Sequence, residues 1–354
     1  MIITQPRTGI FATLALSLLS IGICALFTPE QFGSWVTLIL VSMVPSQIIL
    51  TLFLGGKLPG RSNDIRQPFK GSLLVLITLV TGGITYCVIQ LLNKGLLNLP
   101  TPFSIMQAIL TVVVALWMVI VFQGWPTSLI RNPFISAFVL LLSVLLVSYF
   151  VFQLLFNFSA FQAAPFYSTT LDPAGLLPAW HALALTTTSV AVILVFVMQD
   201  FWPFSVFKTS PLINAAVIAI LSVAIWAIAV YVVKADPVRY MVAGPISMIF
   251  GEFILLIMLQ TAPFQQMPQP KKGSFLTLIA LALCLSLFPI YDSVATGLFP
   301  ELVAGAPTYG VELWIASAML AVTFPIFVLY AEMLQFWPFQ QNINKEVIHE
   351  SAES

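Results

Sequence analysis

Charged residues are scarce in this chain. Only 7% of its 354 residues are Asp, Glu, Lys or Arg, whereas 60% are hydrophobic. A soluble globular protein carries about 25% charged residues, so the composition excludes a soluble domain and indicates an integral membrane protein. Lys and Arg balance Asp and Glu at 13 each. A chain without net charge has no electrostatic basis for binding nucleic acid.

Histidine and cysteine are also rare. The two histidines are His181 and His349, and His349 lies in a polar C-terminal segment. A b-type haem needs two facing histidines within the membrane, and copper or di-iron sites need several, so we expect no haem and no multi-His metal centre. The three cysteines, Cys24, Cys87 and Cys284, lie in apolar runs without a CxxC pair, which is typical of small buried hydrophobic residues.

Catalytic and nucleotide-binding motifs are missing as well. The chain contains no GxxxxGK[ST], no HExxH and no GxSxG sequence, which removes the usual signatures of a P-loop, a zinc protease and a serine hydrolase. We therefore expect no bound cofactor. Whether the protein is an enzyme stays open, with a non-enzymatic role favoured.

What the chain does contain is long apolar runs. A run of about 20 apolar residues forms a helix long enough to cross ~30 Å of hydrocarbon, and the short alternating segments of a membrane barrel are absent. The sequence predicts an all-α protein with ten transmembrane helices in one polytopic domain, 1–338, followed by a short polar cytoplasmic tail, 339–354. We expect the first run to be retained and not cleaved as a signal peptide. The runs are 8–27, 34–55, 71–93, 104–123, 133–156, 180–199, 211–233, 241–260, 273–296 and 312–334.

The distribution of basic residues predicts the orientation. With the N-terminus in the cytoplasm, the outer segments hold only Lys94, Lys234 and Arg239, and the inner segments hold the rest of the 13 Lys and Arg residues. Positive residues favour the cytoplasmic side, so both termini are predicted to be cytoplasmic. We expect the protein to reside in a bacterial or archaeal cytoplasmic membrane.

Proline-containing steps recur at one side of the predicted bundle. Four of the five even-numbered runs end at an aromatic-proline or alanine-proline step, and the second run ends at Leu58-Pro59. The four steps are Trp125-Pro126, Trp202-Pro203, Ala262-Pro263 and Trp337-Pro338. Proline ends a helix and tryptophan favours the membrane interface, so we interpret these residues as structural cytoplasmic turns.

The odd-numbered runs begin with a second recurring signal. Each starts at a proline that follows Gln5, Gln67, Asn132, Ser210 or Gln269, and the three copies with glutamine carry a glycine three residues after the proline. The two signals together predict five parallel tandem helical-hairpin repeats. Their approximate bounds are 6–59, 68–126, 133–203, 211–263 and 270–338.

Glu252 breaks this pattern, because it places a carboxyl group at the middle of the eighth run. An ionisable residue at that depth is costly and is a candidate for function. Two interpretations stay open: a neutral Glu252 that donates a hydrogen bond to a neighbouring helix, or a proton- or ligand-binding group. Gly251 beside it would allow close helix approach or entry of a ligand.

Polar residues near the proline steps are interpreted as structural. Glu332 and Asp200 lie within two turns of a Trp-Pro step, and we expect them to reach the cytoplasmic surface. Gln123, Gln260 and Gln335 share the position of Asp200, two residues before the Trp or Ala. We expect their side chains to cap backbone groups at the helix end.

A second group of candidates lies at the predicted outer side. His181 opens the sixth run, and Tyr291 and Asp292 lie near the outer end of the ninth. These three side chains are the strongest acid–base candidates, and His181 and Asp292 would form an outer vestibule if the fold brings them together. The alternative is that they are interfacial residues at helix ends.

Three functional hypotheses remain. The first is a permease or channel-like carrier for a small neutral or weakly polar solute, with Glu252 as a proton- or ligand-binding group; the lack of basic residues in the runs argues against an anionic substrate. The second is a non-catalytic membrane subunit or scaffold that contacts quinone or lipid and docks a membrane or cytoplasmic partner protein. The third is an intramembrane lipid-modifying enzyme. In each case the lipid bilayer is the first partner.

Overall fold

The computed structural model describes residues 5–58, 65–93, 100–207, 209–262 and 264–339. The predicted turn residues Pro59 and Pro263 and the predicted tail from residue 340 lie outside this part. Within it the chain is mostly helical, and ten helices are long and apolar enough to cross a membrane. The prediction of a multi-pass helical membrane protein is therefore confirmed.

We number these helices as spans 1 to 10 in chain order. They are span 1, α1 (Arg7–Cys24); span 2, α2 (Pro29–Gln31), η1 (Phe32–Val36), α3 (Thr37–Ile48) and η2 (Ile49–Phe53); span 3, α4 (Phe69–Asn93); span 4, α5 (Pro102–Leu116) and η4 (Trp117–Val121); span 5, α6 (Pro133–Leu155); span 6, α7 (Ala179–Met198); span 7, α9 (Pro211–Ala227) and η7 (Ile228–Val232); span 8, α10 (Pro237–Met241), η8 (Val242–Ile246), α11 (Ser247–Phe253) and η9 (Ile254–Met258); span 9, α12 (Lys271–Leu298); and span 10, α13 (Gly310–Ala316), η11 (Ser317–Thr323), α14 (Phe324–Val328) and η12 (Leu329–Met333).

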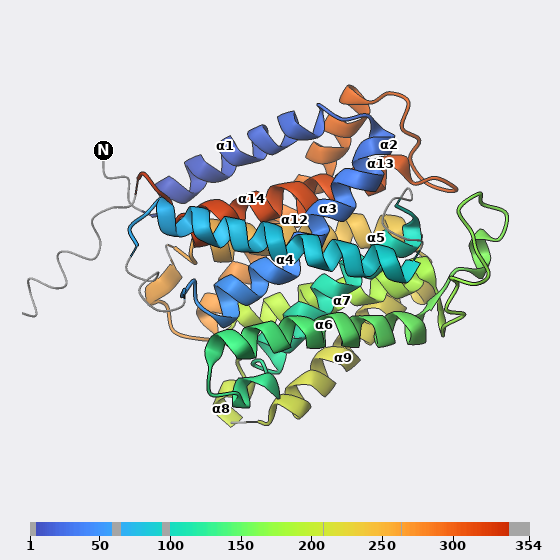
Figure 1. The fold of residues 1–354 in the computed structure, drawn as a ribbon. Coiled ribbons are helices and arrows are strands. Elements are labelled where there is room, and N and C mark those ends of the chain that lie inside the picture. Colours follow the sequence, from blue (N-terminus) through green and yellow to red (C-terminus); the bar gives the residue numbers. More distant parts are fainter. Residues whose placement is uncertain (1–4, 59–64, 94–99, 208, 263, 340–354) are drawn as a thin grey trace, which may run out of the picture.

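The spans run side by side, and the bundle has two distinct ends (Figure 1). At the turn end, the chain enters span 1 and leaves span 10, and short segments connect spans: η5 (Thr127–Leu129), α8 (Phe204–Phe207) and η10 (Phe264–Gln266). At the loop end, two longer loops leave spans 5 and 9. The first contains β1 (Phe156–Asn157) and η6 (Ser159–Phe161) and ends at β2 (Leu177–Pro178), which pairs in parallel with β1.

Burial alternates along the chain. Between 61% and 72% of the residues in the apolar core of each even-numbered span are buried inside the protein, against 22% to 33% for each odd-numbered span. The odd-numbered spans direct large apolar side chains outward, as a lipid-facing surface requires; examples are Leu14, Leu76, Leu146, Ile220 and Leu285. The even-numbered spans are therefore the inner helices, and the odd-numbered spans are the outer helices.

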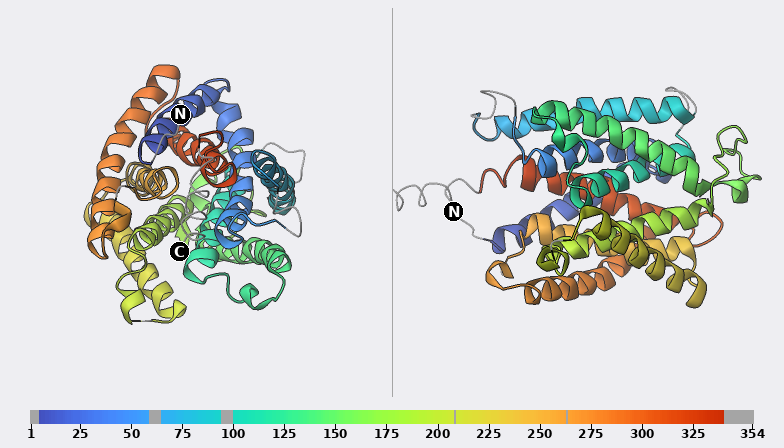
Figure 2. Two further views of the ribbon diagram at one scale, coloured as in Figure 1. Left: turned by 90° about the vertical axis from the view of Figure 1, so that its left-hand side faces the viewer. Right: turned by 90° about the horizontal axis from the view of Figure 1, so that it is seen from below.

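The inner helices form a closed ring. Each packs against the inner helices before and after it in the chain, and span 10 also packs against span 2. The left view of Figure 2 looks along the helices and shows the outer ones around this ring. Each outer helix packs against two inner helices: span 1 against spans 8 and 10, span 3 against 10 and 2, span 5 against 2 and 4, span 7 against 4 and 6, and span 9 against 6 and 8. Spans 3 and 9 also contact the inner helix that follows them in the chain.

All five inner helices end in the same backbone conformation. Two successive residues after each helix have positive φ angles between 49° and 74°: Gly55-Gly56, Gln123-Gly124, Asp200-Phe201, Gln260-Thr261 and Gln335-Phe336. This left-handed conformation commonly ends helices because it returns N–H groups to the last carbonyl groups. Phe336, for example, donates to the carbonyl of Tyr330 over 3.0 Å.

This geometry corrects one expectation from the sequence. We expected the side chains of Gln123, Asp200, Gln260 and Gln335 to cap the helix ends, but the shared feature is their left-handed backbone. Asp200 does use its side chain, which accepts a hydrogen bond from Gln269 and forms an ion pair with Lys272 at 3.5 Å.

The glutamines before the outer helices join those helices to the inner ring. Each donates its amide N–H to a methionine carbonyl at the end of an inner helix, and its amide oxygen accepts from the N–H of the glycine four residues later. The first kind of bond joins Gln5 to Met258 (3.2 Å), Gln67 to Met333 (2.9 Å) and Gln269 to Met198 (3.1 Å). The second kind joins them to Gly9, Gly71 and Gly273.

Glycine is needed in these three places because the helices approach closely. A Cβ atom on Gly71 would lie 2.9 Å from the carbonyl oxygen of Met333, and one on Gly273 would lie 2.8 Å from the Cα of Gln199. In the two copies without glutamine, Asn132 and Ser210 cap the first turn of their own helices.

Acidic side chains accept hydrogen bonds from backbone groups in the two loops at the loop end. Asp172 accepts hydrogen bonds from the N–H groups of Phe158 and Ala174 and from the hydroxyl of Tyr167. In the second loop both carboxylate oxygens of buried Glu312 accept from the N–H of Gly305, at 3.0 and 3.1 Å. These carboxylates satisfy backbone groups that would otherwise be unpaired.

Candidate functional site

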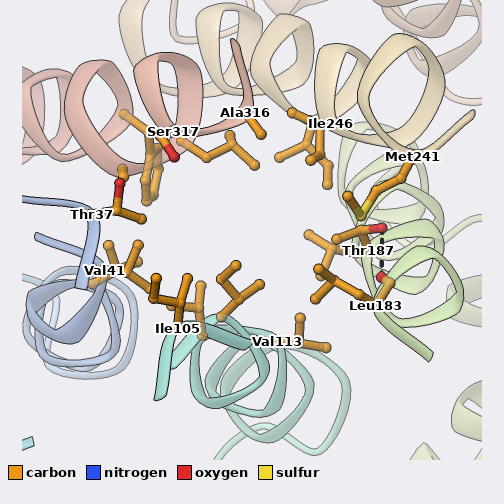
Figure 3. A pocket seen from close by; sticks show the side chains of 18 of the residues that line it. Thr37, Val41, Ile105, Val113, Leu183, Thr187, Met241, Ile246, Ala316 and Ser317 are labelled. Carbon is orange, nitrogen blue, oxygen red and sulfur yellow. Dashed lines mark hydrogen bonds between the residues drawn. The ribbon is translucent and has the colours of Figure 1, made fainter. Parts of the chain in front are cut away.

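A cavity of about 120 Å³ lies inside the inner ring, nearer the loop end, and we call it the loop-side cavity. All five inner helices contribute to its wall. Figure 3 shows side chains from the five helices directed toward the central space, among them Val41, Ile105, Leu183, Ile246 and Ala316. Cavities between the helices of a bundle are common ligand sites.

A second cavity of about 140 Å³ lies nearer the turn end, and we call it the turn-side cavity. It too is lined by all five inner helices. Leu116, Phe253 and Phe324 line both cavities. The rings of Phe253 and Phe324 stack with their centroids 4.0 Å apart. These three apolar side chains form a neck between the two cavities.

The sequence of the inner helices explains these apolar walls. In span 8, Ile246, Ile249 and Phe253 line the loop-side cavity and Leu256 lines the turn-side cavity. This spacing of three and four residues places side chains on one face of a helix. A helix face that packs against another helix is equally apolar. The sequence therefore does not distinguish a cavity-lining face from a face that packs against a neighbouring helix.

Few polar groups line the cavities. Thr37, Thr187 and Ser317 line the loop-side cavity. The hydroxyls of Thr37 and Thr187 donate to carbonyl groups of their own helices, over 2.6 Å to Phe32 and 2.9 Å to Leu183. Such bonds satisfy a hydroxyl within an apolar environment.

Glu332 is the ionisable residue in the wall of the turn-side cavity, where Thr51 is its polar neighbour in the lining. The side chain is half-buried. Thr51 donates its hydroxyl to the carbonyl of Gln47, and within the described residues no hydrogen bond or ion pair reaches the Glu332 carboxylate. Glu332, which we expected to reach the cytoplasmic surface, thus lines the turn-side cavity and is partly exposed.

Glu252 is placed differently. It is fully buried in span 8 but lines neither cavity of the inner ring. Phe253 faces the neck, and a rotation of about 100° per residue directs Glu252 toward the helix flank. Neither carboxylate oxygen has a hydrogen-bond partner among the described residues, so the bond to a neighbouring helix, one of the two interpretations, is not found. Gly251 does permit close approach, since a Cβ there would lie 3.1 Å from the carbonyl oxygen of Ala280.

The three outer candidates occupy separate environments. The ring of His181 lies 6.1 Å from that of Trp226 and 6.3 Å from that of Tyr231, both in span 7. Tyr291 is buried against Phe250 of span 8. Asp292 is half-buried beside it. Within the described residues no hydrogen bond or ion pair joins His181, Tyr291 and Asp292 to one another. The predicted pairing of His181 with Asp292 is therefore not seen as a direct interaction.

Neither a metal-binding group among the described residues nor a similar known protein was found. The part of the chain that the structure describes contains no group of three or more His, Cys, Asp or Glu side chains arranged to hold a metal ion. No family model, no curated protein and no solved structure matches this chain.

Proposed function

We propose that the protein is a permease or channel-like carrier for a small neutral or weakly polar solute, and that the solute passes along the axis of the inner ring. One observation carries the proposal: the five most buried spans surround two cavities that share a neck. A ring that served only to pack its helices would fill this axis with side chains.

The chemistry of the walls supports this substrate class. Burying an unpaired charge in an apolar environment is very costly, so the neck of Leu116, Phe253 and Phe324 favours an uncharged solute. Hydroxyl groups such as those of Thr37, Thr187 and Ser317 offer weak polar contacts. Glu252 lies outside the axial path in this proposal, so a role for its proton would act through helix packing.

Five parallel tandem hairpin repeats are part of the proposal. The repeats are supported by the five left-handed helix ends and by the contact of every outer helix with two inner helices of the ring. We further propose that the turn end faces the cytoplasm, with both termini there, in agreement with the distribution of Lys and Arg.

The test is solute flux into vesicles that contain the purified protein. Swelling in glycerol or urea, followed by light scattering, should be faster with wild-type protein than without protein for at least one of these solutes. Ala316 lines the loop-side cavity, and a tryptophan there would fill it. We expect Ala316→Trp to lower the flux by about tenfold or more, equivalent to at least ~1.4 kcal/mol of barrier.

Leu278→Trp is the matched control, because Leu278 is 62% exposed on the outer face of span 9. It should keep wild-type flux. Flux that equals the leak of protein-free vesicles for every solute, or equal flux in Ala316→Trp and wild type, would contradict the proposal.

A further inference from the structure

The turn-side cavity combines one carboxylate with apolar walls. Ile48, Leu52, Ile120, Leu194 and Val197 supply apolar side chains from three inner helices. Glu332 supplies the carboxylate from a fourth. A cavity with these two parts is suited to a ligand that has an apolar body and a positively charged or hydrogen-bond-donating end.

We propose that the turn-side cavity binds a small amphiphilic ammonium ion, with Glu332 as the counter-charge. The carboxylate has no protein partner among the described residues, so a ligand does not have to displace one. Because Glu332 is only half-buried, the charged end of a ligand reaches it without losing all contact with water, which limits the desolvation cost of the ion pair.

The size of the cavity sets the size of the ligand. An apolar cavity of about 150 Å³ holds one benzene molecule, and the turn-side cavity has about 140 Å³. A five- or six-membered ring, or a chain of similar volume, therefore fits beside Glu332. Larger hydrophobic amines do not fit without displacing side chains of the ring.

The neck determines which protonation form of an amine passes between the two cavities. Leu116, Phe253 and Phe324 separate Glu332 from the loop-side cavity, and an ammonium ion in that apolar passage would lose its counter-charge. An amine therefore crosses the neck in its neutral form, takes up a proton from water at the half-buried Glu332, and is held there as the cation. This substrate class, small weakly basic amines, rests on the proposed function, whereas binding at Glu332 does not require transport.

The test is a binding measurement on the full-length protein in lipid nanodiscs at neutral pH. Cyclopentylamine, which is positively charged there, and cyclopentanol, which is neutral and of similar size, are the two probes. Wild-type protein should bind cyclopentylamine saturably and more tightly than cyclopentanol. Glu332→Gln should weaken cyclopentylamine binding by at least tenfold and leave cyclopentanol binding unchanged.

Two further variants keep the test decisive. Glu252→Gln removes a buried carboxyl group that lines neither cavity, so it should bind cyclopentylamine as wild type does. Val197→Phe should fill the cavity and weaken the binding of both probes. If Glu332→Gln does not fold, Val197→Phe still tests the place of binding, and Glu332→Asp, which keeps the charge, should retain preference for the amine.

Equal cyclopentylamine affinity in wild type and Glu332→Gln, or no saturable binding to wild type, would overturn the inference. Its failure is distinct from failure of the proposed function. Glycerol or urea flux without amine binding would retain the permease and remove the amine site. Amine binding without any flux would retain the site and remove the permease.

Discussion

At Gln67 one amide group has two roles. Its oxygen accepts from the N–H of Gly71 in the first turn of span 3, and its N–H group donates to the carbonyl of Met333 at the end of span 10. Both backbone groups belong to helix ends, where no partner exists within the helix. An unpaired buried group of this kind costs about 1–3 kcal/mol, so the glutamine stabilises two helices and their contact together.

Gly71 offers a test at the same site. Gly71→Ala would place a methyl group 2.9 Å from the carbonyl oxygen of Met333, and we expect a loss of about 1–3 kcal/mol of stability. Thermal unfolding of the purified protein in detergent measures it. Gly83→Ala is the control, because Gly83 lies in the same helix and a Cβ there meets nothing within 4 Å. A Gly71→Ala variant as stable as Gly83→Ala would show that the contact is not tight.

The sequence revealed the pattern of some structural residues but not the contacts that they make. The pattern of Gln-Pro and a later Gly was visible, and its cause is a contact between residues 266 positions apart for Gln67 and Met333. No local signal reveals such a partner. The sequence also did not predict that Glu332 lines a cavity, because the cavity depends on the packing of all five inner helices.

At the scale of elements, spans 8 and 10 are fastened together at the loop end. Asp236 caps the first turn of α10 by accepting from the N–H groups of Val238 and Arg239, and its second oxygen accepts from the hydroxyl of Tyr309, at 2.7 Å. Tyr309 directly precedes span 10. Burial and then the bond to Asp236 raise the pKa of Tyr309 to about 12.

This bond has a predictable pH dependence. Because the folded-state pKa exceeds the ordinary value of about 10, the contribution of the neutral phenol to stability is full below pH ~10 and is lost as the pH rises toward 12. We expect Tyr309→Phe to lower stability by about 1–2 kcal/mol at pH 8. We also expect it to lose less stability than wild type between pH 8 and pH 11.

Thermal unfolding at these two pH values is the measurement. Tyr231→Phe is the control, since Tyr231 is 60% exposed and forms no hydrogen bond within the described residues. Parallel pH profiles for wild type and Tyr309→Phe would argue against this role of the Asp236 bond.

The helices themselves were predictable from apolar length, and the ten predicted runs correspond to the ten spans. The widened π-helical turns that end spans 2, 4, 7, 8 and 10 were not predicted. Their sequences carry no local signal for a widened turn, and span 6, which is followed by the same left-handed pair, ends without one. The paired strands β1 and β2 were also missed, because two residues each give no periodic signal.

At the scale of the molecule, the separation into inner and outer helices was not predicted. Mean apolar character is similar in both sets, because lipid and protein interior are both apolar environments. The cavities depend on the arrangement of all five inner helices, so the sequence did not predict them. Only the scarcity of charge at mid-depth pointed toward an uncharged solute.

The proposed orientation has a direct test. In a variant without Cys24, Cys87 and Cys284, single cysteines replace Glu301 at the loop end or Gln265 at the turn end, both exposed. A membrane-impermeant maleimide should label Glu301→Cys in intact cells, and Gln265→Cys only after permeabilisation, because the excess of Lys and Arg predicts a cytoplasmic turn end. The reverse labelling pattern would show that the termini are outside.

The placement of span 1 has a consequence for biogenesis. This helix precedes the other nine spans in the chain, yet its main neighbours are spans 8 and 10, and the carbonyl that Gln5 reaches is 253 residues further along the chain. Domains are completed in the order of synthesis, so span 1 waits in the bilayer while most of the protein is still being translated. During that interval the surface around Gly9 that later meets span 8 faces lipid or the insertion machinery, and the ring closes only when the last hairpin arrives.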